Sequence, residues 1–487
     1  MKKDPSLKSQ ASSLFIGNLV GTVFQFLIPA IIVRLISQED FGVFRQFGLV
    51  GGTFIGLLGM GYRSSLFYFF PITDFKGKQK IIQQTLLLFF INLVIFSIVF
   101  YFYGNQILVY FNFGEFVNMK LLLVLFIAFM ILSSLVIIIF TLEKNNLYNK
   151  VYPSVEKISR FFIFLIIILL IPGYKGPIIA LLIFGFLRLI YFLFHGAQYF
   201  KTIYSIDIKL MKEQLAYSLP FGFALILNTI ATKFDKFFIN QYITPSEFGI
   251  YSIAFLSIPI LKQFFQSIHN VVVPEISISM KNNNIVKATN LWKKTVEKTS
   301  SITIPAVFLF WLLANEIITI LYTVDYIEAA NYYRIFILMF FVSMFSHEII
   351  LRGANKTKYI LLSNIIGSVL TVVVGLVLIP KMGLYGAIIT ALIGSVSPML
   401  ISLNIERKIM GLKIKNWVDW KKIAINFLIC FLITLPIFIL KDYITNIYIR
   451  TFISGSLFVA LIIPLQMKFG IFIFSDMLLK VLSYFKK

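Results

Sequence analysis

Long uninterrupted apolar runs dominate this chain of 487 residues. Most of them contain about 18 to 25 residues, and a helix rises about 1.5 Å per residue, so each run can cross the hydrocarbon core of a bilayer. Hydrophobic residues make up 59% of the chain and charged residues only 13%, and the mean hydropathy is +0.89. A soluble fold could not bury that much apolar surface. The sequence therefore predicts an all-α, polytopic integral membrane protein.

Fourteen apolar runs are long enough to be candidate spans. They cover approximately residues 12–36, 44–70, 81–103, 119–142, 151–171, 177–197, 214–235, 248–273, 299–323, 332–352, 358–380, 383–404, 422–440 and 446–467. With the N-terminus in the cytoplasm, the inner segments carry 31 of the 44 lysines and arginines and the outer segments carry 10. The positive-inside rule expects such an excess, so the pattern predicts fourteen spans with both termini in the cytoplasm.

The net charge of +23 would suggest a nucleic-acid partner in a soluble protein. Here the cations lie mostly in short inner segments, so we expect no nucleic acid and instead contact with the lipid bilayer. Three segments are amphipathic and are expected to lie along the membrane surface: residues 198–213, residues 274–298 and the tail 468–487.

An internal repeat relates the two halves of the chain. QEDFGVF from Gln38 aligns with PSEFGIY from Pro245 at an offset of 207, and KGPIIALLI from Lys175 aligns with LYGAIITALI from Leu384 at an offset of 210. These matches predict two six-span lobes, residues 1–200 and 201–410, followed by residues 411–487 with the last two spans and the tail. Because six is an even number, the copies keep the same orientation and should be related by an axis along the membrane normal.

Polar residues recur at helical spacing within three of the predicted spans, so each set shares one helix face. The stripes are Asn18, Thr22 and Gln25 in the first span, Asn228, Thr232 and Asp235 in the seventh, and Lys262, Gln266 and His269 in the eighth. The side chain of His269 either forms a hydrogen bond between two helices or acts as a proton relay.

Several charged residues also fall within predicted spans, where a charge costs about 3 kcal/mol and usually faces a polar interior. They are Arg63, Arg188, Lys233, Asp235, Lys236, Lys262, Glu348 and Arg352. Together they predict a hydrated, mainly cationic lumen. Asp235 is either part of a structural ion pair with Lys233 or Lys236 or a functional site. Glu348 and Arg352 are one turn apart and can pair within the helix.

No pattern typical of an enzyme emerges. The three histidines do not form an HExxH motif, and the chain has neither a Walker A loop nor a Gly-x-Ser-x-Gly motif. We therefore predict no catalytic residues, no metal site, no cofactor and no transport driven by the chain's own ATP hydrolysis.

Several of these stretches resemble the polysaccharide transporter branch of the MOP superfamily, the Wzx-type lipid-linked oligosaccharide flippases. RLISQEDFGVFRQFGLVGGTFIGLLGMGYRSSLFYFFP from Arg34 resembles the family's first hairpin, and DKFFINQYITPSEFGIYSIA from Asp235 resembles its second. LAYSLPFGFA from Leu215 resembles the entry to the seventh span, and PKMGLYGAIITALI from Pro380 resembles the turn between spans eleven and twelve. The similarity covers most of the chain and is least marked over the last two spans.

The resemblance implies fourteen helices in two lobes around a central cavity that is often cationic. It also implies translocation of an undecaprenyl-pyrophosphate-linked oligosaccharide, a unit of O-antigen, capsule or exopolysaccharide, across the bacterial cytoplasmic membrane by alternating access. By analogy, the lumen cations would meet the pyrophosphate and one of two acids would couple an ion gradient. The cations are Arg63, Lys233, Lys236 and Lys262, and the acids are Asp235 and Glu348. Other membrane proteins of polysaccharide assembly are candidate partners.

Three alternatives remain open. A drug/cation antiporter of the same superfamily would favour acidic lumen residues, whereas the charges here are mainly basic. A lipid II flippase is a close relative of the family. A membrane glycan polymerase or acyltransferase usually places its catalytic groups on a large outer loop, and the longest outer segment expected here, 104–118, has about 15 residues.

Overall fold

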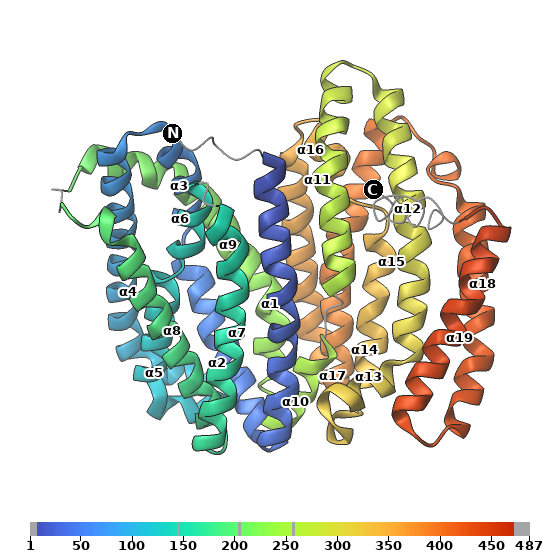
Figure 1. Ribbon diagram of the computed structural model, residues 1–487, viewed down its shortest axis with the longest axis horizontal. Helices are drawn as coiled ribbons and strands as arrows, with labels where there is room; N and C mark the ends of the chain where they lie inside the picture. Colours follow the sequence, from blue (N-terminus) through green and yellow to red (C-terminus); the bar gives the residue numbers. More distant parts are fainter. Residues whose placement is uncertain (1–6, 144–145, 203–205, 256–258, 472–487) are drawn as a thin grey trace. The chain divides into compact units, whose positions relative to one another are not determined.

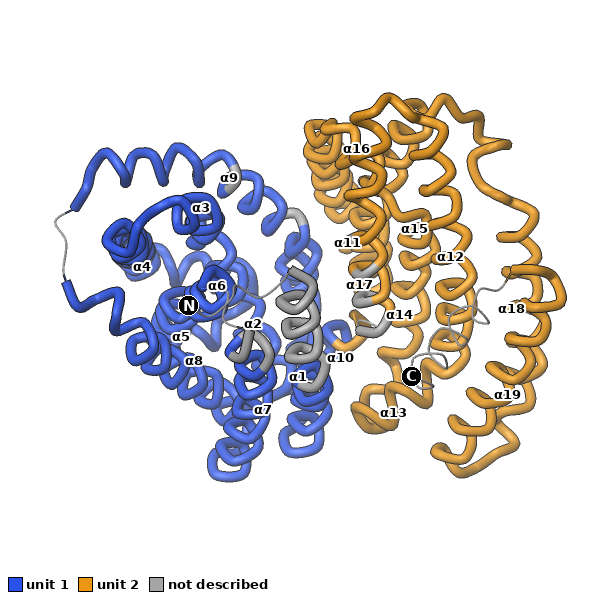
Figure 2. Tube along the Cα trace, turned by 45° about the horizontal axis from the view of Figure 1, so that its top comes forward, with its two compact units in different colours: residues 1–252 blue, residues 253–487 orange. Residues whose placement is uncertain are grey.

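The computed structural model describes residues 7–143, 146–202, 206–255 and 259–471, and within these ranges the side chains of residues 7–20 and of Lys262, among others, are not described. The described elements are all helices (Figure 1), which confirms the predicted all-α membrane fold. The chain divides into two compact units, unit 1 of residues 1–252 and unit 2 of residues 253–487 (Figure 2). The C-terminal part of the predicted surface tail, from residue 472 onward, lies outside the described residues.

Unit 1 begins with the long helix α1 and ends within α10. Its α-helices are α1 (Leu7–Leu35), α2 (Gln38–Leu58), α3 (Tyr62–Phe69), α4 (Phe75–Tyr110), α5 (Lys120–Leu132), α6 (Leu135–Leu142), α7 (Asn146–Leu170), α8 (Lys175–His195), α9 (Ile208–Ile239) and α10 (Pro245–Ala254). Polar caps define where several of them start: the side chain of Ser37 accepts from Asp40 N, that of Asp74 from Gly77 N and that of Asp207 from Leu210 N.

Unit 2 contains the remaining helices. They are α11 (Pro259–Lys281), α12 (Ile285–Leu312), α13 (Ala314–Tyr322), α14 (Ala329–Phe336), α15 (Phe340–Ser343), α16 (Ile349–Gly353), α17 (Thr357–Ile409), α18 (Trp420–Leu440) and α19 (Ile447–Lys468). Helix α17 is kinked at Gly383, whose φ of 55° lies in the left-handed region that glycine tolerates. The kink falls at the predicted boundary between spans eleven and twelve.

Eight helices in the described part of the chain are long and apolar enough to cross a membrane, and α12 with α13, bent by 66°, would make a ninth. Helix α17 counts once among the eight although it bends at Gly383. Shorter apolar helices cover Gly21–Leu35 and Ala329–Ser343. The chain is therefore a multi-pass membrane protein, and the number fourteen stays a prediction.

The expectation of a separate surface segment at residues 274–298 is wrong. Helix α11 continues to Lys281 and α12 starts again at Ile285, so the segment extends two long helices that meet at a short turn (Figure 1). The turn is defined locally, because the Asn284 side chain accepts from Lys287 N at 2.9 Å and caps α12.

The two repeated turns meet inside unit 1. Ser246 Oγ donates to Gln38 Oε1 at 2.8 Å, and Arg45 Nε donates to Ser252 Oγ at 3.0 Å. The backbones approach so closely that a Cβ on Gly42 would lie 1.7 Å from the carbonyl oxygen of Pro245. Residues about 207 positions apart therefore lie side by side at these two turns.

The division into compact units groups α9 and α10 with the first eight helices, although the repeat assigns them to the second copy. The structural boundary therefore lies after residue 252, whereas the repeat boundary was predicted after residue 200. The lobes 1–200, 201–410 and 411–487 remain predictions about the repeat.

Candidate functional site

Asp235, near the charged end of α9, forms a hydrogen bond to the next helix, α10. This carboxylate is only 2% exposed, and it accepts a hydrogen bond from Tyr251 Oη at 2.6 Å. Lys236 Nζ lies 2.9 Å from the same carboxylate and 5.9 Å from the centre of the Tyr251 ring. A buried charge is tolerated when it is paired and hydrogen-bonded, so Asp235 joins α9 to the repeated turn as part of an ion pair.

Lys233 differs from its neighbour. It makes no ion pair or side-chain hydrogen bond within the described ranges, and its charged neighbours are Arg45, Asp235 and Lys236. Of the two lysines predicted beside Asp235, the structure therefore assigns the pairing to Lys236 and leaves the ammonium of Lys233 available.

The polar stripe of α1 faces α7 only in part. Thr22 Oγ1 accepts from Lys157 Nζ at 3.4 Å, while Gln25 is exposed. The helices approach closely beside Gly21, where a Cβ would lie 2.6 Å from the Lys157 Cδ atom. The side chain of Asn18, the third residue of the stripe, lies outside the described part of the structure.

The corresponding stripe of α9 is mostly open. Asn228 and Thr232 are both exposed, and Thr232 Oγ1 donates to the Asn228 carbonyl oxygen at 2.8 Å, a bond within the helix. Only Asp235 of this stripe is buried.

Cations gather around Arg188, where α7 and α8 contribute side chains. Arg188 Nε lies 3.4 Å from Glu156 Oε1, and it is close enough to Arg63 and Arg160 to repel both. The guanidinium of Arg160 lies 5.5 Å from the Phe164 ring and 5.4 Å from the Phe184 ring, a cation–π arrangement. We call Arg63, Arg160 and Arg188 the arginine cluster.

The arginine cluster has unused hydrogen-bond donors. The Nε atom of Arg160 is buried and has no hydrogen-bond acceptor in the described part of the chain, and Arg63 makes no hydrogen bond or ion pair there, whereas Arg188 Nε is held by the 3.4 Å ion pair with Glu156. Glu156 is the acidic residue found among these arginines in the described ranges. Three cations with one acid and orphaned donors are poised to bind an anion.

Two of these residues, Glu156 and Arg160, were not named as site residues, although both lie within the predicted span 151–171. The structure places both on α7, which begins at Asn146. Glu156 and Arg160 are four residues apart on one helix face, and this spacing is the signal that could have identified them.

In unit 2 the predicted pair of Glu348 and Arg352 is present, with Arg352 Nη2 2.6 Å from Glu348 Oε2. Glu348 itself has a φ of 69°, and the helix is broken between α15 and α16. Glu406 of α17, which was not predicted, is fully buried and accepts from Ile350 N at 2.6 Å and Leu351 N at 3.1 Å. This carboxylate secures the first turn of α16.

The third predicted stripe lies on α11. Gln266 is exposed, and the side chain of Lys262 is outside the described structure. The Nε2 atom of His269 is buried without a hydrogen-bond partner in the described ranges, as is the Nδ1 atom of His347. Among the described residues no three His, Cys, Asp or Glu side chains gather in a way that could hold a metal ion.

Comparison with known proteins gives consistent results. The profile of a family described as polysaccharide biosynthesis protein matches residues 31–331, more than half of the chain. An uncharacterized membrane protein of Methanocaldococcus jannaschii is 25% identical over 213 residues, which span 41% of this chain and only 39% of that relative.

Solved structures of transporters share the fold. The lipid II flippase MurJ in an inward closed conformation has a TM-score of 0.71 at 17% identity and covers 94% of this chain and 98% of its own. An inward-facing multidrug resistance MATE family transporter of the MOP superfamily has a TM-score of 0.59 at 15% identity, covering 84% of this chain and 98% of its own. A MOP superfamily transporter from Pyrococcus furiosus has a TM-score of 0.54 at 15% identity, covering 83% and 95%.

At these identities the likenesses show the fold and not the substrate. They agree with the fold that the resemblance of the hairpin motifs implies. Because the family profile matches more than half of the chain, the chain belongs to the family described as polysaccharide biosynthesis protein.

Proposed function

We propose that this protein is a flippase that moves an undecaprenyl-pyrophosphate-linked oligosaccharide across the bacterial cytoplasmic membrane by alternating access, with both termini in the cytoplasm. Family membership and the fold shared with a lipid II flippase support the transport class. The observation that carries the proposal is the arginine cluster, because its three cations face one acid and the buried Nε atom of Arg160 has no acceptor in the described part of the chain.

The chemistry of the substrate fits this cluster. A pyrophosphate is a compact, doubly charged anion, and guanidinium groups bind phosphate oxygens through paired N–H donors. The polyprenyl tail is apolar and can stay in the hydrocarbon, whereas the sugar and the pyrophosphate need a polar path. Arg63 and Arg188 would contact the pyrophosphate, and Lys233 is a further candidate because its ammonium is available.

The remaining predicted site residues have different proposed roles. Lys236 is occupied by Asp235 and would reach a substrate only if that pair opened. Asp235 is the candidate for ion coupling in unit 1, because it holds Lys236. Glu348 is the candidate in unit 2, where it is paired with Arg352. Lys262 remains a prediction.

The antiporter alternative is less well supported. A binding site for a cationic drug needs a carboxylate that is free to meet the drug. In the interior of unit 1, Asp235 is paired with Lys236 and Glu156 with Arg188. These pairings favour an anionic substrate over a cationic one.

A cellular test separates these functions. Deletion of the gene should abolish surface polysaccharide while lipid-linked repeat units accumulate inside the cell. Complementation with Arg63→Gln/Arg188→Gln should fail at normal protein levels, whereas Arg407→Gln at the end of α17 should restore export. Normal polysaccharide together with new drug sensitivity in the deletion strain would overturn the proposal in favour of the antiporter.

The proposed topology has its own test. The chain has one cysteine, the buried Cys430, so Cys430→Ser gives a background for cysteine labelling. Single cysteines at residues 104–118 and 324–331 should react from outside the cell, and those at 274–298 only after permeabilisation. Labelling with the opposite sidedness would reject cytoplasmic termini.

A further inference from the structure

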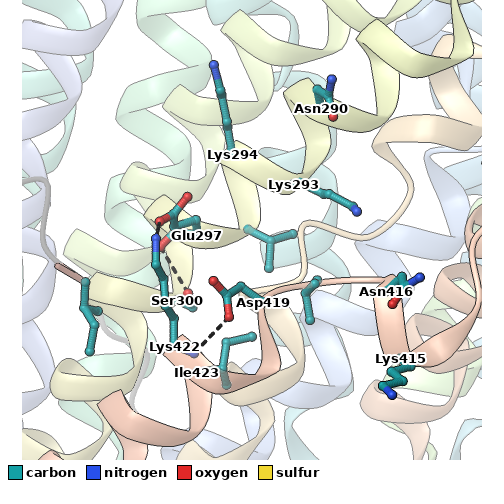
Figure 3. Close-up of a pocket in the computed structure, with 13 residues that line it drawn as sticks. Asn290, Lys293, Lys294, Glu297, Ser300, Lys415, Asn416, Asp419, Lys422 and Ile423 are labelled. Carbon is teal, nitrogen blue, oxygen red and sulfur yellow. Dashed lines mark hydrogen bonds and ion pairs between the residues drawn. The ribbon is translucent and has the colours of Figure 1, made fainter. Parts of the chain in front are cut away.

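A pocket of about 580 Å³ opens at one end of unit 2 (Figure 3). Its walls come from α12, from the link that follows α17 and from the first turn of α18, so the lining residues are distant in sequence. Helix α18 is a candidate span that starts at Trp420, and the pocket residues Asp419 and Lys422 flank this start. The pocket therefore lies where the chain enters the bilayer, at the level of the lipid headgroups.

The lining is basic. Four lysines, Lys293, Lys294, Lys415 and Lys422, face two acids, Glu297 and Asp419. Both acids are already engaged: Glu297 pairs with Lys422, and Asp419 Oδ1 accepts from Lys422 N at 3.1 Å and caps α18.

Three lysines of the lining remain without a counter-charge. Lys293, Lys294 and Lys415 make no ion pair or side-chain hydrogen bond within the described part of the chain. In Figure 3, Lys293 extends from α12 toward the segment that carries Asn416 and Lys415. Lysines that line a concavity and have no carboxylate paired with them favour an anionic ligand.

An aromatic cluster lies beside the pocket. The rings of Trp292 and Trp417 stack with centroids 5.8 Å apart, and Trp420 Nε1 donates to the Ile414 carbonyl oxygen at 2.7 Å. Trp292 is fully buried, so the cluster anchors α12 to the link that carries Lys415. Trp420 is 38% exposed, and exposed tryptophans are enriched at the membrane–water interface, which supports a pocket at the level of the headgroups.

We propose that this pocket binds the phosphate group of an anionic membrane lipid at the inner face of the bilayer. Basic pockets between helices at this level bind lipid headgroups because the lysines face phosphate while the acyl chains stay in the hydrocarbon. Two sources supply this chemistry: a bilayer phospholipid such as phosphatidylglycerol, or a polyprenyl diphosphate. Only the second source rests on the proposed transport function.

The tryptophans provide the readout. Three of the four lie beside the pocket, and the fourth, Trp311, packs against Arg334 and Phe438 near the opposite end of α18. In full-length protein with Trp311→Phe, reconstituted in phosphatidylcholine nanodiscs, all tryptophan fluorescence therefore comes from the three residues beside the pocket. We expect phosphatidylglycerol with brominated acyl chains to quench this fluorescence at lower lipid fractions than brominated phosphatidylcholine.

Substitution of lysines tests whether the pocket is responsible. Lys293→Gln/Lys415→Gln should raise the phosphatidylglycerol fraction needed for half-quenching by about tenfold, since each surface lysine contributes to headgroup attraction. The matched control Lys281→Gln/Lys287→Gln removes the same charge from the neighbouring α11–α12 turn, outside the pocket lining, and should leave the curve unchanged. Equal curves for the two double variants, or equal quenching by the two brominated lipids, would overturn the proposal.

A competition arm identifies the source of the phosphate. Unlabelled farnesyl pyrophosphate that relieves the quenching, where farnesol does not, assigns the pocket to polyprenyl diphosphates. Quenching by phosphatidylglycerol that farnesyl pyrophosphate leaves intact assigns it to bilayer phospholipid. Neither arm depends on transport, so a failed flippase assay would leave this result unaffected.

Discussion

Removal of Lys441 should loosen the last two helices of unit 2. Lys441 lies directly after α18, and its Nζ atom donates to the Leu312 carbonyl oxygen at 2.8 Å and to the two Glu316 carboxylate oxygens at 2.9 and 3.0 Å. The side chains of Lys441 and Glu316 are only 2% and 1% exposed. Substitution Lys441→Met keeps the apolar stem and removes the charge, so Glu316 is left buried without its main partner.

The size of the effect follows from this geometry. Breaking a buried ion pair on one side typically costs 3–5 kcal/mol, because an uncompensated charge stays buried. Arg450 Nη1, which lies 3.8 Å from Glu316 Oε1, can compensate in part, so we expect the lower end of that range, about 3 kcal/mol. For a unit of this size that free energy corresponds to a Tm lowered by roughly 6–12 °C.

The assay is thermal unfolding of the purified protein in one detergent at one scan rate, followed by intrinsic fluorescence. The double variant Lys441→Met/Glu316→Met is the matched control, since it replaces both charges by apolar groups of similar length and should recover most of the lost stability. Arg450 keeps Asp442 at 3.1 Å and the Ile444 carbonyl oxygen at 2.8 Å in that variant. A single variant as stable as wild type, or a double variant as unstable as the single, would refute the reasoning.

Three further predictions concern contacts within each unit. Gly42→Ala should prevent accumulation of folded protein because its Cβ would lie 1.7 Å from a backbone carbonyl oxygen, whereas Gly48→Ala, with nothing within 4 Å, should express normally on size-exclusion chromatography. Tyr251→Phe removes the 2.6 Å hydrogen bond to Asp235 and should lower stability by about 1–3 kcal/mol in thermal unfolding; an unchanged Tm would contradict the lock between α9 and α10. Glu406→Leu should destabilise by about 2 kcal/mol or more by leaving two amide donors unpaired, while Glu406→Gln should retain most of the stability, and equal Tm values for the two would exclude the capping role.

Local features of this chain were predictable from the sequence. The hydrocarbon core contains no water to pair with backbone amides and carbonyls. An apolar run that spans the bilayer therefore forms a helix, in which these groups pair with each other, so the run lengths predict the helices. The break at Gly383 and the pair of Glu348 with Arg352 also depend on residues that are close in sequence. Such local features can be predicted without knowledge of the tertiary fold.

Contacts between distant helices were not predictable in this way. Lys441 was counted as an outer-segment cation, and nothing in its neighbourhood indicates that Glu316, 125 residues away, would bury it. The choice of Lys236 over Lys233 as the partner of Asp235 depends on side-chain direction, which spacing alone does not fix. Arg160 was predicted to lie within a span, but the spacing along α7 could not show that Arg188 of α8 lies beside it.

The most direct test of the proposed function is transport by the purified protein. Proteoliposomes that carry a fluorescent undecaprenyl-pyrophosphate oligosaccharide report its movement between leaflets through loss of fluorescence to an impermeant quencher. We expect wild-type protein and Arg407→Gln to move the lipid, and Arg63→Gln/Arg188→Gln to move it about tenfold more slowly or worse, because two charge-assisted contacts to the pyrophosphate are lost. Equal rates for the double variant and the wild type would contradict a role for the arginine cluster in moving this anion.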